Sequence, residues 1–360
     1  MVDHLEQKLR VGLAIAPTTR EAIDFVREAE KLGVESVWIP EYWGYDAFTP
    51  AAAVAVATNT MRIATGIAQL DARTPAMLAM SAMGVQELSQ GRFVLGIGTS
   101  GPVVMEGWHG VDFARPVSRT RETIEIVRMI CAGERLSYSG DVYQIPRPGG
   151  LGKPIRSAAS PVEIPIYVAS LGPKNLHLTG ELADGWIGNS FLAETAVTFF
   201  SPIAEGAVAG GRNLSDFDFT VAVGLEITHN EEETMAAGRR HADGYAFTFG
   251  AMGSSKTNYY LDAFARQGFG PAVREVQRLW LEGDRAGAAG AVPIEIGLGT
   301  NLVGTVDDLV ARVQNYVDAG VTTLRVSPLG ETAADRLDAL GTLVDVAGGI
   351  KPIPPPQSNS

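Results

Sequence analysis

Short apolar runs alternate with amphipathic segments along the first hundred residues. The apolar runs begin at Val11, Ser36, Arg62 and Arg92. The amphipathic segments, which have the spacing of helices, cover residues 19–32, 47–58 and 75–88. The runs are continuously apolar, as in parallel strands covered on both faces. Thr74-Pro75 has the form of a helix start, and a glycine follows two of the predicted helices. This pattern predicts successive βα units of a parallel sheet.

The alternation continues, with interruptions, to the end of the chain. Further strands are predicted from Ile164, Gly185, Phe219 and Thr323, which makes eight. Further helices are predicted over residues 119–132, 173–183, 307–319 and 337–346. Residues 137–145 are typical of a small hairpin, and residues 231–302 hold extra helical material and a Gly/Ala-rich loop.

Eight βα units predict an α/β protein with a (β/α)8 (TIM) barrel. We expect a single domain over residues 1–350, with insertions near residues 135–163 and 231–302. A doubly wound open sheet is the alternative that the same pattern allows. The Pro/Ser/Gln-rich residues 351–360 are predicted to be disordered.

Charge and cysteine content narrow the range of partners. The net charge is −12 and the chain has no Lys/Arg run, which argues against binding of nucleic acid or an anionic membrane. Cys131 is the only cysteine, so an intrachain disulfide is impossible, and its apolar helical context predicts a buried thiol. Without a signal peptide or an apolar run of about 18 residues, we expect a cytoplasmic protein.

Functional groups of such barrels gather at the carboxyl ends of the strands. Here those ends are small, polar and rich in glycine, and they hold neither paired carboxylates nor a metal-binding cluster. The segment from Gly96 to Gly101 matches the dinucleotide motif G-x-G-x-x-G, but no clear helix follows it and the next predicted strand begins only at Ile164. The glycines therefore favour close contact between a flat ring and the backbone.

Two further segments carry candidate chemistry. Residues 171–175, with Lys174, lie between a strand and the start of a helix, where free N–H groups and the helix dipole favour a phosphate. An ordinary turn with proline at the first helical position explains the same residues. The long segment 101–118 contains His109, the one histidine placed near the strand ends. A lone histidine is also compatible with a structural role.

Three long segments together resemble the luciferase-like monooxygenase superfamily, and within it the branch that uses the 5-deazaflavin coenzyme F420. They cover residues 63–73, 91–110 and 166–186, and the resemblance extends from about Arg10 to Val346. It implies a (β/α)8 barrel, a homodimer and a ring site in which a non-proline cis peptide at Gly66-Ile67 lies against the deazaflavin. It also makes the loop from Ala169 to Pro173 the phosphate side of the site.

Combining the strand ends with this resemblance defines the expected site. The expected cofactor-binding residues are Glu41, Gly66, Ile67, Gln69, Gly98, Thr99, Ser100, Ala169, Ser170, Leu171, Gly172, Pro173, Lys174, Gly188 and Asn189. The candidates for proton transfer are Glu41, Tyr42 and His109. The expected apolar walls are Trp43, Trp108 and Phe191.

The chain departs from relatives that oxidise glucose 6-phosphate. It has Glu41-Tyr42 where they have Asp-His after the second strand, and Gly101-Pro102 where they have a glutamate after the fourth strand. Their substrate and acid–base assignment are therefore not transferred.

The expected function is hydride transfer between coenzyme F420 and a small organic substrate. A monooxygenase that uses FMN, with the same barrel and ring site, is the nearest alternative. A catalytically silent flavin-binding protein is an alternative of another class.

Overall fold

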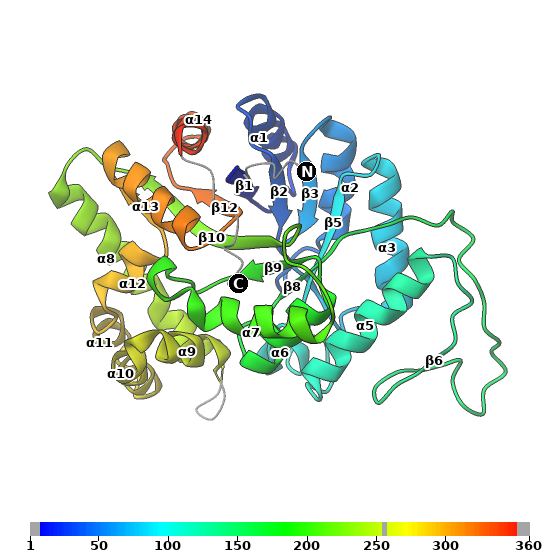
Figure 1. Cartoon of the computed structure of the whole chain (residues 1–360). Helices are drawn as coiled ribbons and strands as arrows, with labels where there is room; N and C mark the ends of the chain where they lie inside the picture. Colours follow the sequence, from blue (N-terminus) through cyan, green and yellow to red (C-terminus); the bar gives the residue numbers. More distant parts are fainter. Residues whose placement is uncertain (1–7, 254–257, 351–360) are drawn as a thin grey trace, which may run out of the picture.

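The fold is a closed barrel of parallel strands surrounded by helices (Figure 1). The computed structural model describes residues 8–253 and 258–350. The barrel strands are β1 (Arg10–Ala14), β2 (Ser36–Ile39), β3 (Arg62–Thr65), β5 (Phe93–Gly98), β8 (Ile166–Ala169), β9 (Gly185–Gly188), β10 (Asp218–Ile227) and β12 (Thr323–Pro328). Each pairs in parallel with its neighbours, and the β9–β10 and β12–β1 pairs close the ring. All eight predicted strands are confirmed, and the open sheet is excluded.

Helices cover the outside of the barrel. They are α1 (Arg20–Lys31), α2 (Phe48–Ala57), α3 (Pro75–Leu88), α5 (Pro116–Cys131), α6 (Pro173–Leu182), α7 (Val197–Ala209), α13 (Val306–Asp318) and α14 (Ala333–Gly349). Side chains of Thr19 and Thr74 cap α1 and α3, and Thr305 and Thr332 form capping boxes on α13 and α14. These local signals explain why most predicted helix starts lie within a few residues of the observed ones.

The barrel interior is packed with side chains below its mouth. Trp38, Ala64, Val94, Tyr167 and Ile187 form a cluster of their own inside the ring of strands. A larger core lies between the strands and the outer helices, and the predicted burial of Cys131 in it is confirmed. Desolvation raises the pKa of this thiol to about 11.

Charges at the amino ends of the strands are paired. The Arg10 Nη2 atom lies 2.8 Å from Asp218 Oδ1, and Tyr167 donates a hydrogen bond of 3.0 Å to the same carboxylate. Thr323 donates to Asp218 as well, at 2.8 Å. The buried Asp218 carboxylate thus accepts several hydrogen bonds and forms an ion pair, which offset the cost of removing its charge from water.

The segment after β10 builds a helical insertion with its own apolar core, seen beside the barrel in Figure 1. Its helices are α8 (Glu231–Ala251), α9 (Tyr259–Phe264), α10 (Gly270–Leu281), α11 (Arg285–Gly290) and α12 (Ile294–Gly299), with the π turn η2 (Ala265–Phe269). The expected Gly/Ala-rich loop is helical because the Asp284 side chain caps α11, accepting from the Gly287 N–H at 2.8 Å. The segment ends in β11 (Leu302–Gly304), which pairs with the last residues of β10 and was not predicted.

Other short elements complete the chain. They are β4 (Ala68–Gln69), α4 (Pro102–Met105), the hairpin of β6 (Tyr138–Ser139) and β7 (Gln144–Ile145), and the 3-10 turn η1 (Ala193–Thr195). The predicted hairpin is confirmed. The segment 101–118 differs from its prediction as a loop, because Pro102 and Pro116 each start a helix. The helix α7 was not predicted either; Pro202 lies inside it and its apolar residues form no single stripe. The tail predicted over residues 351–360 lies outside the described residues.

Two glycines set the close packing of α6 against α7. A Cβ atom on Gly180 would lie 1.8 Å from the Ile203 carbonyl oxygen, and one on Gly206 would lie 1.8 Å from the His177 carbonyl oxygen. In both cases the close contact is with a backbone carbonyl oxygen of the facing helix, which cannot move away unless the helix itself moves. Any side chain at these positions therefore forces the helices apart.

We predict that Gly180→Ala lowers the free energy of unfolding by about 2 kcal/mol or more, because of this overpacking. The matched control is Gly84→Ala on the exposed face of α3, where nothing lies within 4 Å of an added Cβ. That control is expected to be neutral or to stabilise by up to about 1 kcal/mol. Urea unfolding of both variants measures the difference. Equal effects would show that the α6–α7 contact tolerates a methyl group.

Candidate functional site

A pocket of about 960 Å³ opens at the carboxyl ends of the barrel strands. Its described wall combines strand ends with α4, the starts of α5, α6 and α9, and the end of α8. The lining residues are Trp43, Gly66, Ile67, Gly98, Thr99, Ser100, Gly101, Val103, Val104, Gly107, Trp108, Pro116, Val117, Ala169, Ser170, Leu171, Gly172, Pro173, Lys174, Asn175, Ile187, Asn189, Phe247, Ala251, Met252, Tyr259 and Tyr260. The volume is large enough for a cofactor-sized ligand.

The pocket floor consists of Gly66, Ile67, Gly98 and Ala169. The peptide bond between Gly66 and Ile67 is cis, as the family resemblance implies. A Cβ atom on Gly98 would lie 2.7 Å from Ile67 Cδ1 and 3.2 Å from Ala169 Cβ. Because no larger residue fits there, the floor presents backbone and small side chains to the pocket, which suits a flat ring.

One end of the pocket is polar and is built by the start of α6. Gly172 occupies the N-cap position and no side chain caps the helix. Pro173 has no N–H group and the Asn175 N–H group donates to the Gly172 carbonyl oxygen at 3.0 Å, so the Lys174 N–H group is the one in the first turn that remains for a ligand. Lys174 in that turn is exposed at the pocket wall. The Asn175 Oδ1 atom is buried there without a hydrogen-bond partner. Helix dipole, ammonium and amide together favour a phosphate with neighbouring hydroxyl groups.

A second cation reaches this end from far along the chain. The Arg266 Nη2 atom in η2 donates to the Leu171 carbonyl oxygen at 2.6 Å. It thereby ties the insertion to the loop that precedes α6. Sequence reasoning missed this residue, because no local pattern relates positions 171 and 266.

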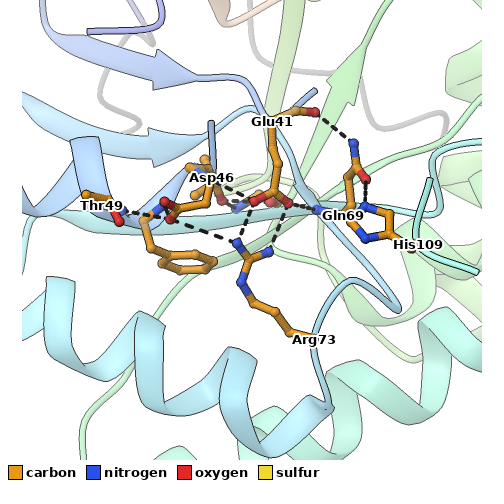
Figure 2. Close-up of polar contacts among 10 residues, drawn as sticks. Glu41, Asp46, Thr49, Gln69, Arg73 and His109 are labelled. Carbon is orange, nitrogen blue, oxygen red and sulfur yellow. Dashed lines mark hydrogen bonds and ion pairs between the residues drawn. The ribbon is translucent and has the colours of Figure 1, made fainter. Parts of the chain in front are cut away.

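Glu41 is held in a polar network whose residues lie outside the pocket lining (Figure 2). Its carboxylate accepts from Arg73 Nη1 at 2.9 Å and Nη2 at 2.5 Å, and from the backbone N–H groups of Gln69 at 2.8 Å and Ala47 at 3.2 Å. Gln69 in turn donates to the Glu41 carbonyl oxygen at 2.9 Å, and its Oε1 atom lies 3.0 Å from His109 Nε2. This network joins the segments that follow β2, β3 and β5.

Several residues expected at the site lie outside the pocket lining. Glu41, Gln69 and His109 do not line the pocket: both Glu41 oxygens are occupied by N–H donors, and the His109 ring is turned toward Gln69. Tyr42 is 64% exposed and also lies outside the lining. None of the three candidates for proton transfer therefore reaches the pocket in this structure.

Two other expected positions lie behind the wall. The Gly188 carbonyl oxygen accepts from Arg325 and the residue is absent from the lining, while its neighbours Ile187 and Asn189 line the pocket. Phe191 is buried among other aromatic rings, and its ring centroid lies 5.8 Å from that of Trp186. Trp43 and Trp108 do form part of the wall, as predicted. All the remaining expected cofactor-binding residues line the pocket.

The insertion supplies an aromatic wall that sequence reasoning missed. Asn258 caps α9 by accepting from the backbone of Tyr260 at 3.1 Å, and its amide donates to the Phe249 carbonyl oxygen of α8 at 2.8 Å. This link brings Tyr259 and Tyr260 to the pocket. Burial raises the pKa of the Tyr260 phenol, so it stays protonated at neutral pH. The N-cap asparagine before two aromatic residues was the local signal available.

In the described parts of the chain, no group of three or more His, Cys, Asp or Glu side chains could hold a metal ion. Within the same residues, no helix combines the length and apolar character needed to cross a membrane.

The family model described as luciferase-like monooxygenase matches residues 4–323. A protein of Mycobacterium tuberculosis named "Putative coenzyme F420-dependent oxidoreductase Rv3520c" is 34% identical over 352 residues, which cover 94% of this chain and 100% of that protein.

Two solved structures share the fold. The coenzyme F420-dependent tetrahydromethanopterin reductase of Methanopyrus kandleri has a TM-score of 0.76 at 22% identity, covering 93% of this chain and 97% of that one. The oxygenating constituent of 3,6-diketocamphane monooxygenase of Pseudomonas putida, in complex with FMN, has a TM-score of 0.68 at 18% identity, with 96% and 100% covered.

The polar network around Glu41 leads to a stability prediction. Arg73→Met leaves the buried Glu41 carboxylate without its cation, and we expect a loss of about 3 kcal/mol in the free energy of unfolding. The control is Arg27→Met, which removes an exposed pair with Asp24 on α1 and is expected to cost less than about 1 kcal/mol. Chemical unfolding of both variants gives the comparison. If Arg73→Met lowered the free energy of unfolding no more than Arg27→Met does, the result would contradict the role of Arg73 as the partner of a buried carboxylate.

Proposed function

The chain belongs to the luciferase-like monooxygenase family, and on that premise we propose that it is an oxidoreductase that uses coenzyme F420. It transfers a hydride between the deazaflavin and an organic substrate. The observation that carries the proposal is one continuous pocket with a glycine floor for a ring and an uncapped helix start for a phosphate. The name of the mycobacterial relative supports it.

The residues of the pocket fit the parts of this cofactor. The pocket floor would carry the ring, and Lys174 with the first turn of α6 would hold the phosphate. Asn175 Oδ1, buried without a partner, would accept from a hydroxyl of the tail. The bound deazaflavin supplies the hydride chemistry, while the protein binds, orients and excludes water.

The apolar part of the pocket lining points to an uncharged, largely apolar substrate. It includes Trp43, Val103, Trp108 and Phe247. Lys174 is the only Lys, Arg, His, Asp or Glu residue in the described lining, and we assign it to the cofactor. Tyr260 replaces Glu41, Tyr42 and His109 as our candidate proton donor, because it reaches the pocket and stays protonated.

A monooxygenase that uses FMN is the second candidate, favoured by the fold shared with the FMN complex. Titration of the purified protein with F420 and, separately, with FMN distinguishes the two. We expect saturable binding of F420 with weak or absent binding of FMN. Tight binding of FMN without binding of F420 would overturn the proposal. The family resemblance also leads us to propose a homodimer in solution.

Lys174 provides the residue-level test. We predict that Lys174→Met weakens F420 binding about fivefold, corresponding to about 1 kcal/mol, and that added salt reduces the difference. Lys153→Met, at an exposed position outside the pocket, is the matched control and should bind as the unaltered protein does. Equal affinities of the two variants for F420 would contradict a phosphate site at the start of α6.

A further inference from the structure

Arg325 is a buried cation directly below the pocket. On β12, Leu324 and Val326 belong to the outer core, so the alternation of the strand turns Arg325 into the barrel. The residue is 4% exposed. Its guanidinium lies over the Trp38 ring, 5.5 Å from the centroid.

The charge of Arg325 has no counter-charge among the described residues. Its Nη2 atom donates to the Gly188 carbonyl oxygen at 2.7 Å and to Asn189 Oδ1 at 3.2 Å, and its Nε atom is buried without a partner. Arg10, at the amino ends of the strands, is in contrast paired with Asp218. An unpaired buried charge costs several kcal/mol, which calls for a functional explanation.

The guanidinium is close to the surface that would carry the ring. A Cβ atom on Gly66 would lie 3.6 Å from Arg325 Nη1, and Gly66 belongs to the pocket floor. Asn189, which accepts from Arg325, lines the pocket as well. The positive charge thus lies one layer of backbone below the pocket.

The surroundings of Arg325 leave its guanidinium protonated. Burial lowers the pKa of Arg325 to about 10, so the guanidinium remains protonated at neutral pH. Among the described titratable groups, the Tyr42 phenol is the one whose charge bears on it. In the described parts of β2, β9 and β12, the strands that contact the guanidinium, no carboxylate forms an ion pair with it.

We infer that Arg325 is a positioning residue whose fixed positive charge stabilises the negative charge that a hydride adds to the ring, so that the pocket binds the reduced cofactor more tightly than the oxidised one. The inference rests on the proposed function. A hydride brings two electrons and one proton, so the ring that receives it gains one negative charge until a further proton binds. A nearby cation in a medium of low dielectric constant stabilises that charge.

The experiment compares dissociation constants of oxidised and reduced F420 at one pH near neutrality. We expect Arg325→Met to weaken binding of the reduced form on the order of tenfold more than that of the oxidised form. Arg325→Lys, which keeps the charge, should restore most of the preference. Arg62→Met removes a cation at the opposite end of the barrel and should leave the ratio unchanged.

The neutral variants must fold for the comparison of dissociation constants to be valid. Removal of an uncompensated buried charge also removes the cost of its desolvation, so Arg325→Met is expected to fold, as a thermal unfolding curve would show. Arg325→Gln serves as a second neutral variant. An unchanged ratio in the folded neutral variants would overturn the inference. Failure of the unaltered protein to bind F420 in either form would instead contradict the proposed function.

Discussion

Closure of the barrel through the β12–β1 pair is the constraint on which the rest of the structure depends. Because all eight strands run parallel around a closed ring, their carboxyl ends meet at one mouth. Bulky side chains such as Trp38 and Tyr167 fill the interior below, and Gly66 and Gly98 keep the mouth open. The pocket is therefore a consequence of where large and small residues stand along strands of fixed direction.

The sequence patterns were sufficient for the barrel because the deciding signals are local. Continuous apolar runs mark strands covered on both faces, and Thr74 before Pro75 marks a helix start through a side-chain cap. The pocket floor and the start of α6 were predictable for the same reason, since they lie on contiguous segments directly after β3, β5 and β8. The division into one domain with two insertions stays a prediction.

Other parts of the site depend on contacts between distant segments. Arg73 reaches Glu41 from the segment after the neighbouring strand, and Asn258 brings Tyr260 to the pocket; neither relation has a local signature. Glu41 was expected to take part in chemistry because it follows a strand end, yet its carboxylate, surrounded by four N–H donors, holds the segments after β2 and β3 together. Arg325 escaped notice because an arginine within an apolar strand does not show from sequence which face it occupies.

The central claim is that the glycine floor at the strand ends carries a deazaflavin ring. A crystal structure of the protein soaked with F420, beside one soaked with FMN, tests it most directly. We expect the F420 ring against Gly66 and Ile67, with its phosphate at the first turn of α6. A ring bound elsewhere, or density for FMN alone on that floor, would contradict it.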